Sequence, residues 1–470
     1  MTNLAIPRQI LRPCQVDALE SMRAEIRRGH HGVLLVAATG FGKTTCAASM
    51  IESAVKKQKR VVFLCHRKEL IEQCSERLDG LGVDHGIIMA NHWRRCPALL
   101  VHVASVQTLV NRELDKAPDI LVIDECHRAA STTYVSIRER FPNAIVIGLT
   151  ATPIRTDGRG LGGKLFSAMV QSPSVRELTD MGYLVPTRVY APTNPDLTGV
   201  HSAGGDYKPG ELQHAMDKPK ITGDVVSHWL KLGEDRQTIL FASGVEASKH
   251  LAEAFRAAGV AAIHLDGESS SEDRTNGLAA LRAGTVRIVC NVALFTEGFD
   301  SPITSCIVDV APTQSLGRYL QKFGRGLRPY PGKTDCIIIS HAGVSHGFVD
   351  DERDWKLTED RMHKKGLTID TSVGVKVCPR CFLALRPEIR ECNCGYLFDM
   401  RPRKGPRQVA GELQEITPEM REARYTTIPQ DRRTQMYCRW VKEAAEKGYK
   451  PGFAKGRYYA MFHCWPRENL

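Results

Sequence analysis

The stretch Ala37-Ala38-Thr39-Gly40-Phe41-Gly42-Lys43-Thr44 follows directly after an apolar run at residues 33–36 and precedes a helix-compatible segment at residues 45–57. Its two glycines, Gly40 and Gly42, let the backbone curl so that successive N–H groups point at phosphate oxygens, and the start of the following helix favours an anion. In such a Walker A loop, Lys43 would hold the β- and γ-phosphates and the Thr44 hydroxyl would bind magnesium. A glycine-rich turn without a ligand is the alternative, and the flanking strand and helix disfavour it. We therefore predict that all eight residues form the binding site of a nucleoside triphosphate.

A pair of carboxylates follows another apolar run, at residues 120–123, in the order Asp124-Glu125-Cys126-His127. The carboxyl ends of parallel strands meet at one edge of a sheet, so this pair is expected beside the phosphate loop. There Asp124 would bind magnesium through water, and Glu125 would orient and deprotonate the attacking water. Cys126 and His127 could also be read as metal ligands, although no partner stands at ligand spacing. The pattern favours hydrolysis of the triphosphate.

Short apolar runs alternate with polar, helix-forming segments through most of the chain, which is typical of parallel sheets covered by helices on both faces. The runs of the first series lie at residues 33–37, 61–65, 99–103, 120–123 and 145–149. A loop-rich stretch at residues 192–220 separates them from a second series at residues 238–242, 262–265, 287–291, 306–310 and 336–340. We therefore predict an α/β fold with two domains of similar size.

The composition is that of an ordinary globular protein, with 470 residues, 42% hydrophobic and 25% charged. Residues 1–15 contain no apolar run of signal-peptide length, and no stretch reaches the roughly eighteen apolar residues of a membrane span. We therefore expect a cytoplasmic protein without a membrane partner. The net charge is +11, and residues 401–470 hold 15 Lys and Arg against 8 Asp and Glu. Such a basic segment suggests a polyanionic partner, with a merely solubilising surface as the alternative.

Four of the 15 cysteines crowd into one short segment. Cys378 and Cys381 are separated by two residues, and Cys392 and Cys394 by one. Two such pairs supply four thiolates for tetrahedral structural Zn²⁺, although the second pair is tighter than usual. A redox pair is the alternative, and a reducing compartment disfavours it.

The ordered motifs of this chain resemble those of superfamily 2 helicases of the DExH type. Residues 11–15 are similar to the Q motif, residues 63–70 to motif Ia, residues 103–109 to the motif before the acidic box, and Thr150-Ala151-Thr152-Pro153 to motif III. Further along, residues 294–300 match motif V and residues 321–328 match motif VI. The sequences at residues 148–163 and 296–300, and the acidic box itself, look like those of bacterial and phage DNA-repair helicases of the RadD type. They are also similar to the motor subunits of some restriction enzymes.

The resemblance implies two tandem RecA-like lobes with ATP and Mg²⁺ bound in the cleft between them. Gln15 would read adenine, and Gly298 and Asp300 of motif V would add to the nucleotide site. Gln321, Arg325 and Arg328 of motif VI would join Lys43 and the acidic box in catalysis. The two arginines can reach the γ-phosphate only if the second lobe closes over the first, and there they would stabilise the transition state.

We therefore predict lobe 1 at residues 1–190, a linker at 191–220, lobe 2 at 221–372, a zinc module at 373–400 and a basic helical tail at 401–470. The tail holds nine of the chain's 31 aromatic residues. Aromatic rings among cations are typical of a platform for single-stranded nucleic acid, although most rings could form the tail's own core, Trp440 above all.

The predicted function is that of an ATP-dependent DNA helicase or translocase working in repair, recombination or replication in a bacterial or phage-infected cytoplasm. DNA, single-stranded or branched, is the expected partner. Two alternatives stay open. One is an RNA helicase, because the motor motifs contact the backbone. The other is a DNA-binding or recruitment module that ATP switches without strand displacement.

Overall fold

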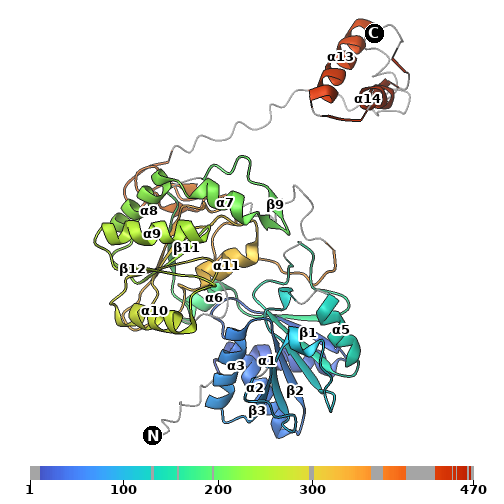
Figure 1. The fold of residues 1–470 in the computed structure, drawn as a ribbon, viewed down its shortest axis with the longest axis vertical. Coiled ribbons are helices and arrows are strands. Elements are labelled where there is room, and N and C mark those ends of the chain that lie inside the picture. Colours follow the sequence, from blue (N-terminus) through green and yellow to red (C-terminus); the bar gives the residue numbers. More distant parts are fainter. Residues whose placement is uncertain are drawn as a thin grey trace. The chain divides into compact units, whose positions relative to one another are not determined.

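The computed structural model describes residues 11–90, 92–128, 132–155, 158–192, 195–295, 301–360, 374–398, 429–446, 448–450, 452–462 and 465–466. The chain divides into two units, Met1–Asp399 and Met400–Leu470. The first unit holds two α/β lobes, and the described helices nearest the C-terminus belong to the second (Figure 1). In the part of the chain that the structure describes, no helix has the length and apolar character needed to cross a membrane.

The first lobe is built on a seven-stranded parallel sheet in the order β3-β4-β2-β5-β6-β1-β7. Its strands are β1 (Gly32–Val36), β2 (Val61–Cys65), β3 (His85–Ile88), β4 (Val101–Ser105), β5 (Ile120–Ile123), β6 (Ile145–Thr150) and β7 (Ala168–Gln171). Its helices are α1 (Pro13–Arg27), α2 (Lys43–Lys56), α3 (Lys68–Gly80), α4 (Val106–Leu109), α5 (Thr132–Arg140) and α6 (Val175–Asp180). Val33 and Leu35 of β1 pack into one hydrophobic cluster, and Leu34 and Val36 pack into another. Helices cover both faces of the sheet, so an unbroken apolar run is buried on both sides.

The second lobe has a six-stranded parallel sheet in the order β12-β13-β11-β14-β15-β8. Its strands are β8 (Thr187–Tyr190), β11 (Thr238–Ala242), β12 (Ala262–Leu265), β13 (Ile288–Asn291), β14 (Cys306–Val310) and β15 (Cys336–Ser340). Its helices are α7 (Pro209–Met216), α8 (Pro219–Leu232), α9 (Val245–Ala257), α10 (Ser271–Ala283) and α11 (Leu316–Gly324). The predicted α/β fold with two parallel sheets is confirmed.

The structure departs from the predicted domain boundaries at three places. Strand β8, assigned to lobe 1, pairs with β15 at the edge of the second sheet. The predicted linker contains a small hairpin, β9 (Ser202–Ala203) with β10 (Asp206–Tyr207), and then α7. Helix α7 forms because Pro209 suits a first helical turn and because Leu212 and Met216 are buried in the core of the second lobe.

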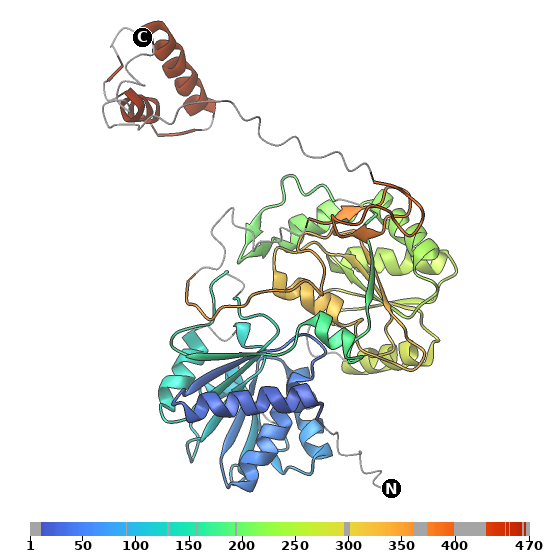
Figure 2. The same ribbon diagram turned by 180° about the vertical axis from the view of Figure 1, so that it is seen from behind.

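The third departure concerns the chain after β15, which was assigned wholly to lobe 2. The chain after β15 runs from the second lobe to the first (Figure 2). Trp355 and Leu357 pack there against the lobe 1 core, and the carbonyl of Thr358 accepts a hydrogen bond from Gly162 N at 3.0 Å. A side chain at Gly160 would place its Cβ 2.0 Å from the Thr358 carbonyl oxygen, so the glycine permits this close approach.

The segment that holds the four cysteines contains a short antiparallel pair, β16 (Lys376–Val377) with β17 (Ala384–Leu385). It is attached to the edge of the second sheet, since Leu383 forms a bridge with Tyr190 and Ala191 N donates to the Phe382 carbonyl at 3.0 Å. We refer to residues 374–398 as the four-cysteine module.

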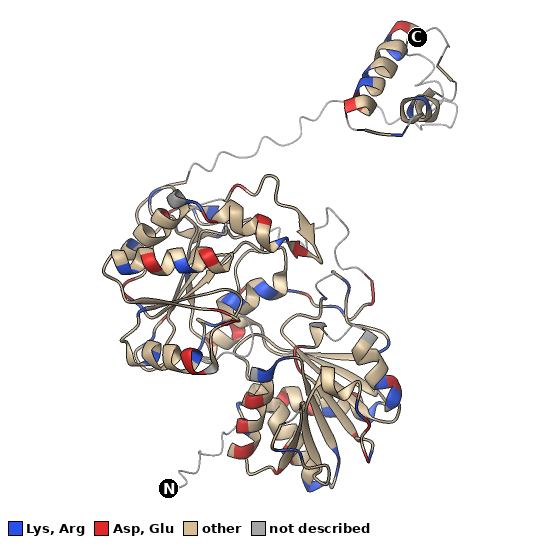
Figure 3. Ribbon diagram, viewed as in Figure 1, with Lys and Arg blue, Asp and Glu red and all other residues tan. Residues whose placement is uncertain are grey.

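The second unit consists of α13 (Gln430–Glu446) and α14 (Phe453–Phe462) among its described residues. Trp440, Tyr458 and Phe462 are buried between the two helices, so the interpretation of Trp440 as a core residue is confirmed. Tyr459 and Trp465, by contrast, are exposed and stack on one another with ring centroids 4.6 Å apart. Lys and Arg lie along both helices (Figure 3). The remainder of the predicted tail, residues 401–428, lies outside the described residues.

Candidate nucleotide site and cysteine cluster

The phosphate loop connects β1 to α2 at the carboxyl edge of the first sheet. Gly40 and Gly42 adopt positive φ angles of 89° and 99°, which residues with a Cβ rarely accept, and α2 begins at Lys43. The ammonium group of Lys43 bends back over the loop and donates to the Ala37 carbonyl at 3.3 Å. Strand, loop and helix thus have the local structure that the sequence predicts for phosphate binding.

The side chain of Gln15 is hydrogen-bonded to the backbone of this loop. Its Nε2 donates to the Phe41 carbonyl at 2.7 Å, and its Oε1 accepts a hydrogen bond from Arg12 N at 2.9 Å. A Cβ at Gly42 would lie 2.4 Å from the same Nε2, so Gly42 also makes room for the glutamine. Arg12 in turn lies over the ring of Tyr183, 4.6 Å from its centroid. Both polar atoms of Gln15 therefore bond to main-chain atoms within the protein.

The acidic pair lies where β5 ends, and both carboxylates are almost fully buried. Glu125 has a positive φ of 47°, and its amide donates to Oδ1 of Asp124 at 3.0 Å. Nδ1 of His127 lies 3.3 Å from Oε2 of Glu125 and 3.3 Å from Oγ1 of Thr150. Thr150 Oγ1 also bonds to the main chain of Thr152. His127 therefore links the glutamate to motif III, a role that the sequence did not indicate.

Helix α11 brings the second lobe into contact with the acidic pair and the phosphate loop. Nε2 of Gln321 donates to Oε2 of Glu125 at 3.3 Å, across the boundary between the lobes. Gly324 lies against Thr39, since a Cβ at Gly324 would be 2.4 Å from the Thr39 methyl group. The arginine-bearing end of α11 therefore packs directly on the phosphate loop.

One cavity of about 980 Å³ unites most of the predicted nucleotide-site residues. Its lining includes Thr39, Gly40, Gly42, Lys43, Thr44, Asp124, Glu125, Gln321, Arg325 and Arg328. It does not include four other predicted residues, namely Gln15, Ala37, Ala38 and Phe41, of which Ala37 and Phe41 are fully buried. Gly298 and Asp300 lie outside the described residues.

Cations that the sequence analysis missed also line this cavity, among them Arg12, Arg77 and Arg282. Arg77 on α3 donates to the Thr45 hydroxyl at 2.8 Å. Burial, together with repulsion from Arg77 and Arg12, lowers the pKa of Arg328 to about 10. An anion between these guanidinium groups would relieve that repulsion. The sequence signal that could have indicated Arg77 is its spacing of four residues from Gln73, which places both polar side chains on the face of α3 that lines the cavity.

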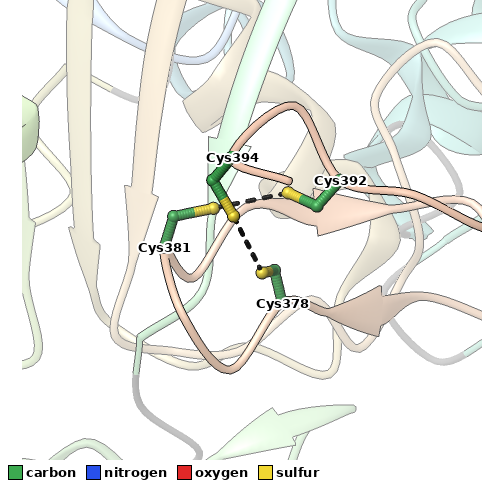
Figure 4. A group of neighbouring side chains, drawn as sticks. All are labelled: Cys378, Cys381, Cys392 and Cys394. Atoms are coloured by element: carbon green, nitrogen blue, oxygen red, sulfur yellow. Dashed lines mark hydrogen bonds between the residues drawn. The ribbon is translucent and has the colours of Figure 1, made fainter. Parts of the chain in front are cut away.

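The four cysteines converge on one point from two loops (Figure 4). Their sulfur atoms all lie within 4.8 Å of one another, with Cys378 to Cys394 at 3.6 Å and Cys381 to Cys392 at 3.5 Å. Sulfur atoms around a tetrahedral Zn²⁺ with Zn–S bonds of about 2.3 Å would be separated by about 3.8 Å. Residue type, number and spacing thus fit a structural zinc ion.

Comparisons with known proteins agree with these two lobes. Residues 8–155 match the family model described as the type III restriction enzyme res subunit, and residues 218–329 match the helicase conserved C-terminal domain. A 51.5 kDa protein of a Lactococcus phage is 31% identical over 81% of this chain and 81% of its own length. A candidate mitochondrial ATP-dependent helicase of Schizosaccharomyces pombe, irc3, is 31% identical over 70% of this chain. The chain spans 57% of the length of that yeast protein.

A solved structure supports the same fold. It is the ATP-dependent type ISP restriction-modification enzyme LlaBIII bound to DNA, which is 17% identical with a TM-score of 0.53. The matched region is 70% of this chain and 28% of that one. Because a restriction-enzyme family model and a helicase family model match in order along the two lobes, the chain belongs to the superfamily 2 helicases, as an ATP-hydrolysing enzyme that resembles the motor subunits of restriction enzymes.

Proposed function

We propose that the chain is an ATP-driven DNA translocase or helicase, in which nucleotide binding closes the two RecA-like lobes and hydrolysis releases them. The hydrogen bond from Gln321 to Glu125 carries this proposal best. It joins a residue of the second lobe to the candidate base of the first, so closure and catalysis depend on the same contact.

Lys43 and Thr44 would hold the triphosphate, with Lys43 exchanging its bond to the Ala37 carbonyl for the β- and γ-phosphates. Magnesium, when bound, supplies positive charge to the phosphates, and the Thr44 hydroxyl and Asp124 carboxylate are the oxygen ligands it prefers. Glu125 would then accept a proton from the attacking water, which Gln321 helps to orient.

Arg325 and Arg328 would complete the site from the second lobe. Both line the cavity, and a guanidinium at the γ-phosphate stabilises the charge that develops in the transition state. A pKa of about 10 still leaves Arg328 charged at neutral pH. We propose that the triphosphate is the anion that balances the cations gathered here.

The segments that follow two neighbouring strands of the first sheet lie together next to the candidate nucleotide site. Strands β2 and β4 are neighbours, and Cys65 pairs with Ser105 at their carboxyl ends. The side chain of Gln107 donates to the His66 carbonyl at 3.3 Å, so the segments that resemble motif Ia and the motif before the acidic box lie together. His127 contacts both Glu125 and Thr150 of motif III, so a change at the bound nucleotide would shift motif III at the carboxyl edge of the first sheet.

DNA is the partner we propose, and one support for it is that a restriction-modification enzyme of the same fold has been solved bound to DNA. The match to a restriction-enzyme family model over the first lobe points the same way. Work in DNA repair, recombination or replication, and a location in the cytoplasm, stay predictions of the sequence. The two alternatives, an RNA helicase and an ATP-switched binding module, are outcomes of the experiment below.

We propose further that the four-cysteine module binds one Zn²⁺ through Cys378, Cys381, Cys392 and Cys394. Elemental analysis of purified protein should find one zinc per chain, and Cys378→Ser should lose it. A zinc content near zero in the unaltered protein would refute the site.

Strand displacement separates the proposed function from its alternatives. A translocase should remove the third strand from a DNA triplex in an ATP-dependent reaction, and a helicase should also separate a forked duplex. An ATP-switched binding module would bind and release DNA with neither activity. Displacement on RNA substrates alone would establish the RNA alternative.

A further inference from the structure

We propose that Arg386 of the four-cysteine module is a positioning residue for helix α11, and that it acts through the turn at residues 346–353. The inference rests on the proposed function, because α11 carries Gln321 and is followed by Arg325. It makes the module part of the ATPase and not only a binding appendage.

Arg386 holds this turn with both ends of its guanidinium group. One nitrogen donates to Oδ1 of Asp351 at 2.8 Å, and another donates to Oδ2 of Asp350 at 3.2 Å. The guanidinium also lies over the ring of Phe348, 5.2 Å from its centroid. Bonds to two carboxylates and stacking on a ring fix both the position and the orientation of the turn.

Internal hydrogen bonds hold the turn at residues 346–353 together, so a displacement on the side that contacts Arg386 also moves the side that contacts α11. The guanidinium of Arg353 donates to four main-chain carbonyls, those of Val349, Asp351, His346 and Phe348. Oδ2 of Asp351 accepts a hydrogen bond from Phe348 N at 2.7 Å. Such a network moves as one body, because shifting any member breaks several bonds.

The turn contacts α11 on its far side. The buried hydroxyl of Tyr319 donates to the Gly347 carbonyl at 2.6 Å, and its ring packs edge-on against His346 at 5.1 Å. Leu320 and Val349 line a small cavity that also borders Thr39 of the phosphate loop. Tyr319 and Leu320 immediately precede Gln321, which bonds to Glu125. The turn therefore supports the helix directly behind the residues that face the nucleotide.

Loss of the support for α11 should affect the hydrolysis step more than the binding of ATP. Lys43 and Thr44 bind ATP from the first lobe, whereas Gln321 and Arg325 reach it from α11. Loosening α11 should therefore reduce transition-state stabilisation more than ground-state binding, which lowers kcat with little change in KM.

Arg386→Ala tests the inference, with Arg390→Ala as a control that removes an exposed arginine from the same module. We expect Arg386→Ala to lower kcat about threefold to tenfold, in the range found for residues that modulate coupling between sites. Its KM for ATP and zinc content should match those of Arg390→Ala. Amide hydrogen exchange should become faster within residues 346–353 of Arg386→Ala and stay unchanged in the control.

A double-mutant cycle makes the route testable. Tyr319→Phe removes only the hydroxyl that bonds to Gly347, so its effect on kcat should be non-additive with that of Arg386→Ala. Arg386→Lys should recover part of the loss, because it keeps one charge but not the two-point geometry. Unchanged kcat in Arg386→Ala, or fully additive effects, would overturn the inference. If the unaltered protein and Arg390→Ala lacked ATP hydrolysis, the proposed function itself would fail.

Discussion

Lys322 Nζ lies 2.7 Å from both carboxylate oxygens of Asp309, and both side chains are almost fully buried. The ammonium also donates to the Ala311 carbonyl at 2.7 Å. Burial raises the pKa of Asp309, and Lys322 opposes that rise by supplying the counter-charge. This pair fixes α11 to the second sheet, while the neighbouring Gln321 reaches the first lobe.

Lys322→Met should destabilise the protein by about 3–5 kcal/mol, because it leaves the Asp309 carboxylate buried without a partner. The free energy of unfolding in urea measures the effect. The double variant Lys322→Met/Asp309→Asn should recover much of the loss, since it removes the buried charge as well. A single variant as stable as the unaltered protein would show that the pair does not hold the helix.

Glu125→Gln should still bind ATP but hydrolyse it about 10² to 10⁴ times more slowly, because the amide keeps the shape of the side chain and cannot accept the proton. Single-turnover hydrolysis and binding of a fluorescent ATP analogue measure the two steps separately. Glu139→Gln, which alters an exposed glutamate of α5, is the matched control. Normal turnover in Glu125→Gln would place the base elsewhere.

The fold was predictable where a strand is buried on both faces. Strands β2, β5, β11, β12, β14 and β15 begin and end at the residues predicted, because apolar residues dominate each of them. Strands β3 and β7 were missed because they are short and mixed in polarity. His85 in β3 is buried only because its ring bonds to Ser75 Oγ at 2.7 Å and to the Val83 carbonyl at 2.9 Å, and those contacts follow from the folded structure.

The candidate site was predictable where function requires a local motif. The phosphate loop and the acidic box each carry their chemistry within a few residues, so their spacing indicates them, and the resemblance to motif VI indicated Gln321, Arg325 and Arg328 at α11. Arg77 and Arg282 lie on helices of different lobes and meet only at the cavity. The turn at residues 346–353 is likewise defined by contacts with Tyr319 and Arg386, which no periodicity reveals.

Acid should destabilise the protein below about pH 6.5, the ordinary pKa of histidine. Burial lowers the pKa of His341 to about 3, with a further contribution from His228. The folded protein therefore keeps His341 neutral while the unfolded chain takes up a proton, so stability is present above pH 6.5 and is lost as pH falls toward 3. Between pH 6.5 and pH 5, protonation of His341 in the unfolded chain lowers the free energy of unfolding by up to about 2 kcal/mol.

Urea unfolding of His341→Gln at pH 7, 6 and 5 measures that dependence. The variant should show a shallower fall in stability, whereas His214→Gln, which changes an exposed histidine, should follow the unaltered protein. Equal slopes in all three proteins would mean that His341 is protonated alike in the folded and unfolded states.

Trp465→Ala should weaken binding of single-stranded DNA by about fivefold to tenfold, because Trp465 and Tyr459 expose ring faces on which bases can stack. Duplex binding should change less, and basal ATP hydrolysis should not change. Trp440→Ala is the contrasting variant, since it removes a core ring and should unfold the unit of α13 and α14.

Deletion of residues 401–470 extends this test by removing a net charge of +7. Each lost phosphate contact should make the slope of log affinity against log salt shallower by nearly one unit. Equal affinity and salt slope with and without the tail would assign it to a protein partner.

DNA should drive ATP hydrolysis across the two lobes. The most direct measurement is the steady-state ATPase rate with no nucleic acid, single-stranded DNA, duplex DNA and single-stranded RNA, for the unaltered protein and for Arg325→Ala. We predict strong stimulation by at least one DNA and little by RNA, with Arg325→Ala about 10³-fold slower under every condition and its ATP binding retained. Stimulation by RNA alone, or full activity of Arg325→Ala, would contradict the account.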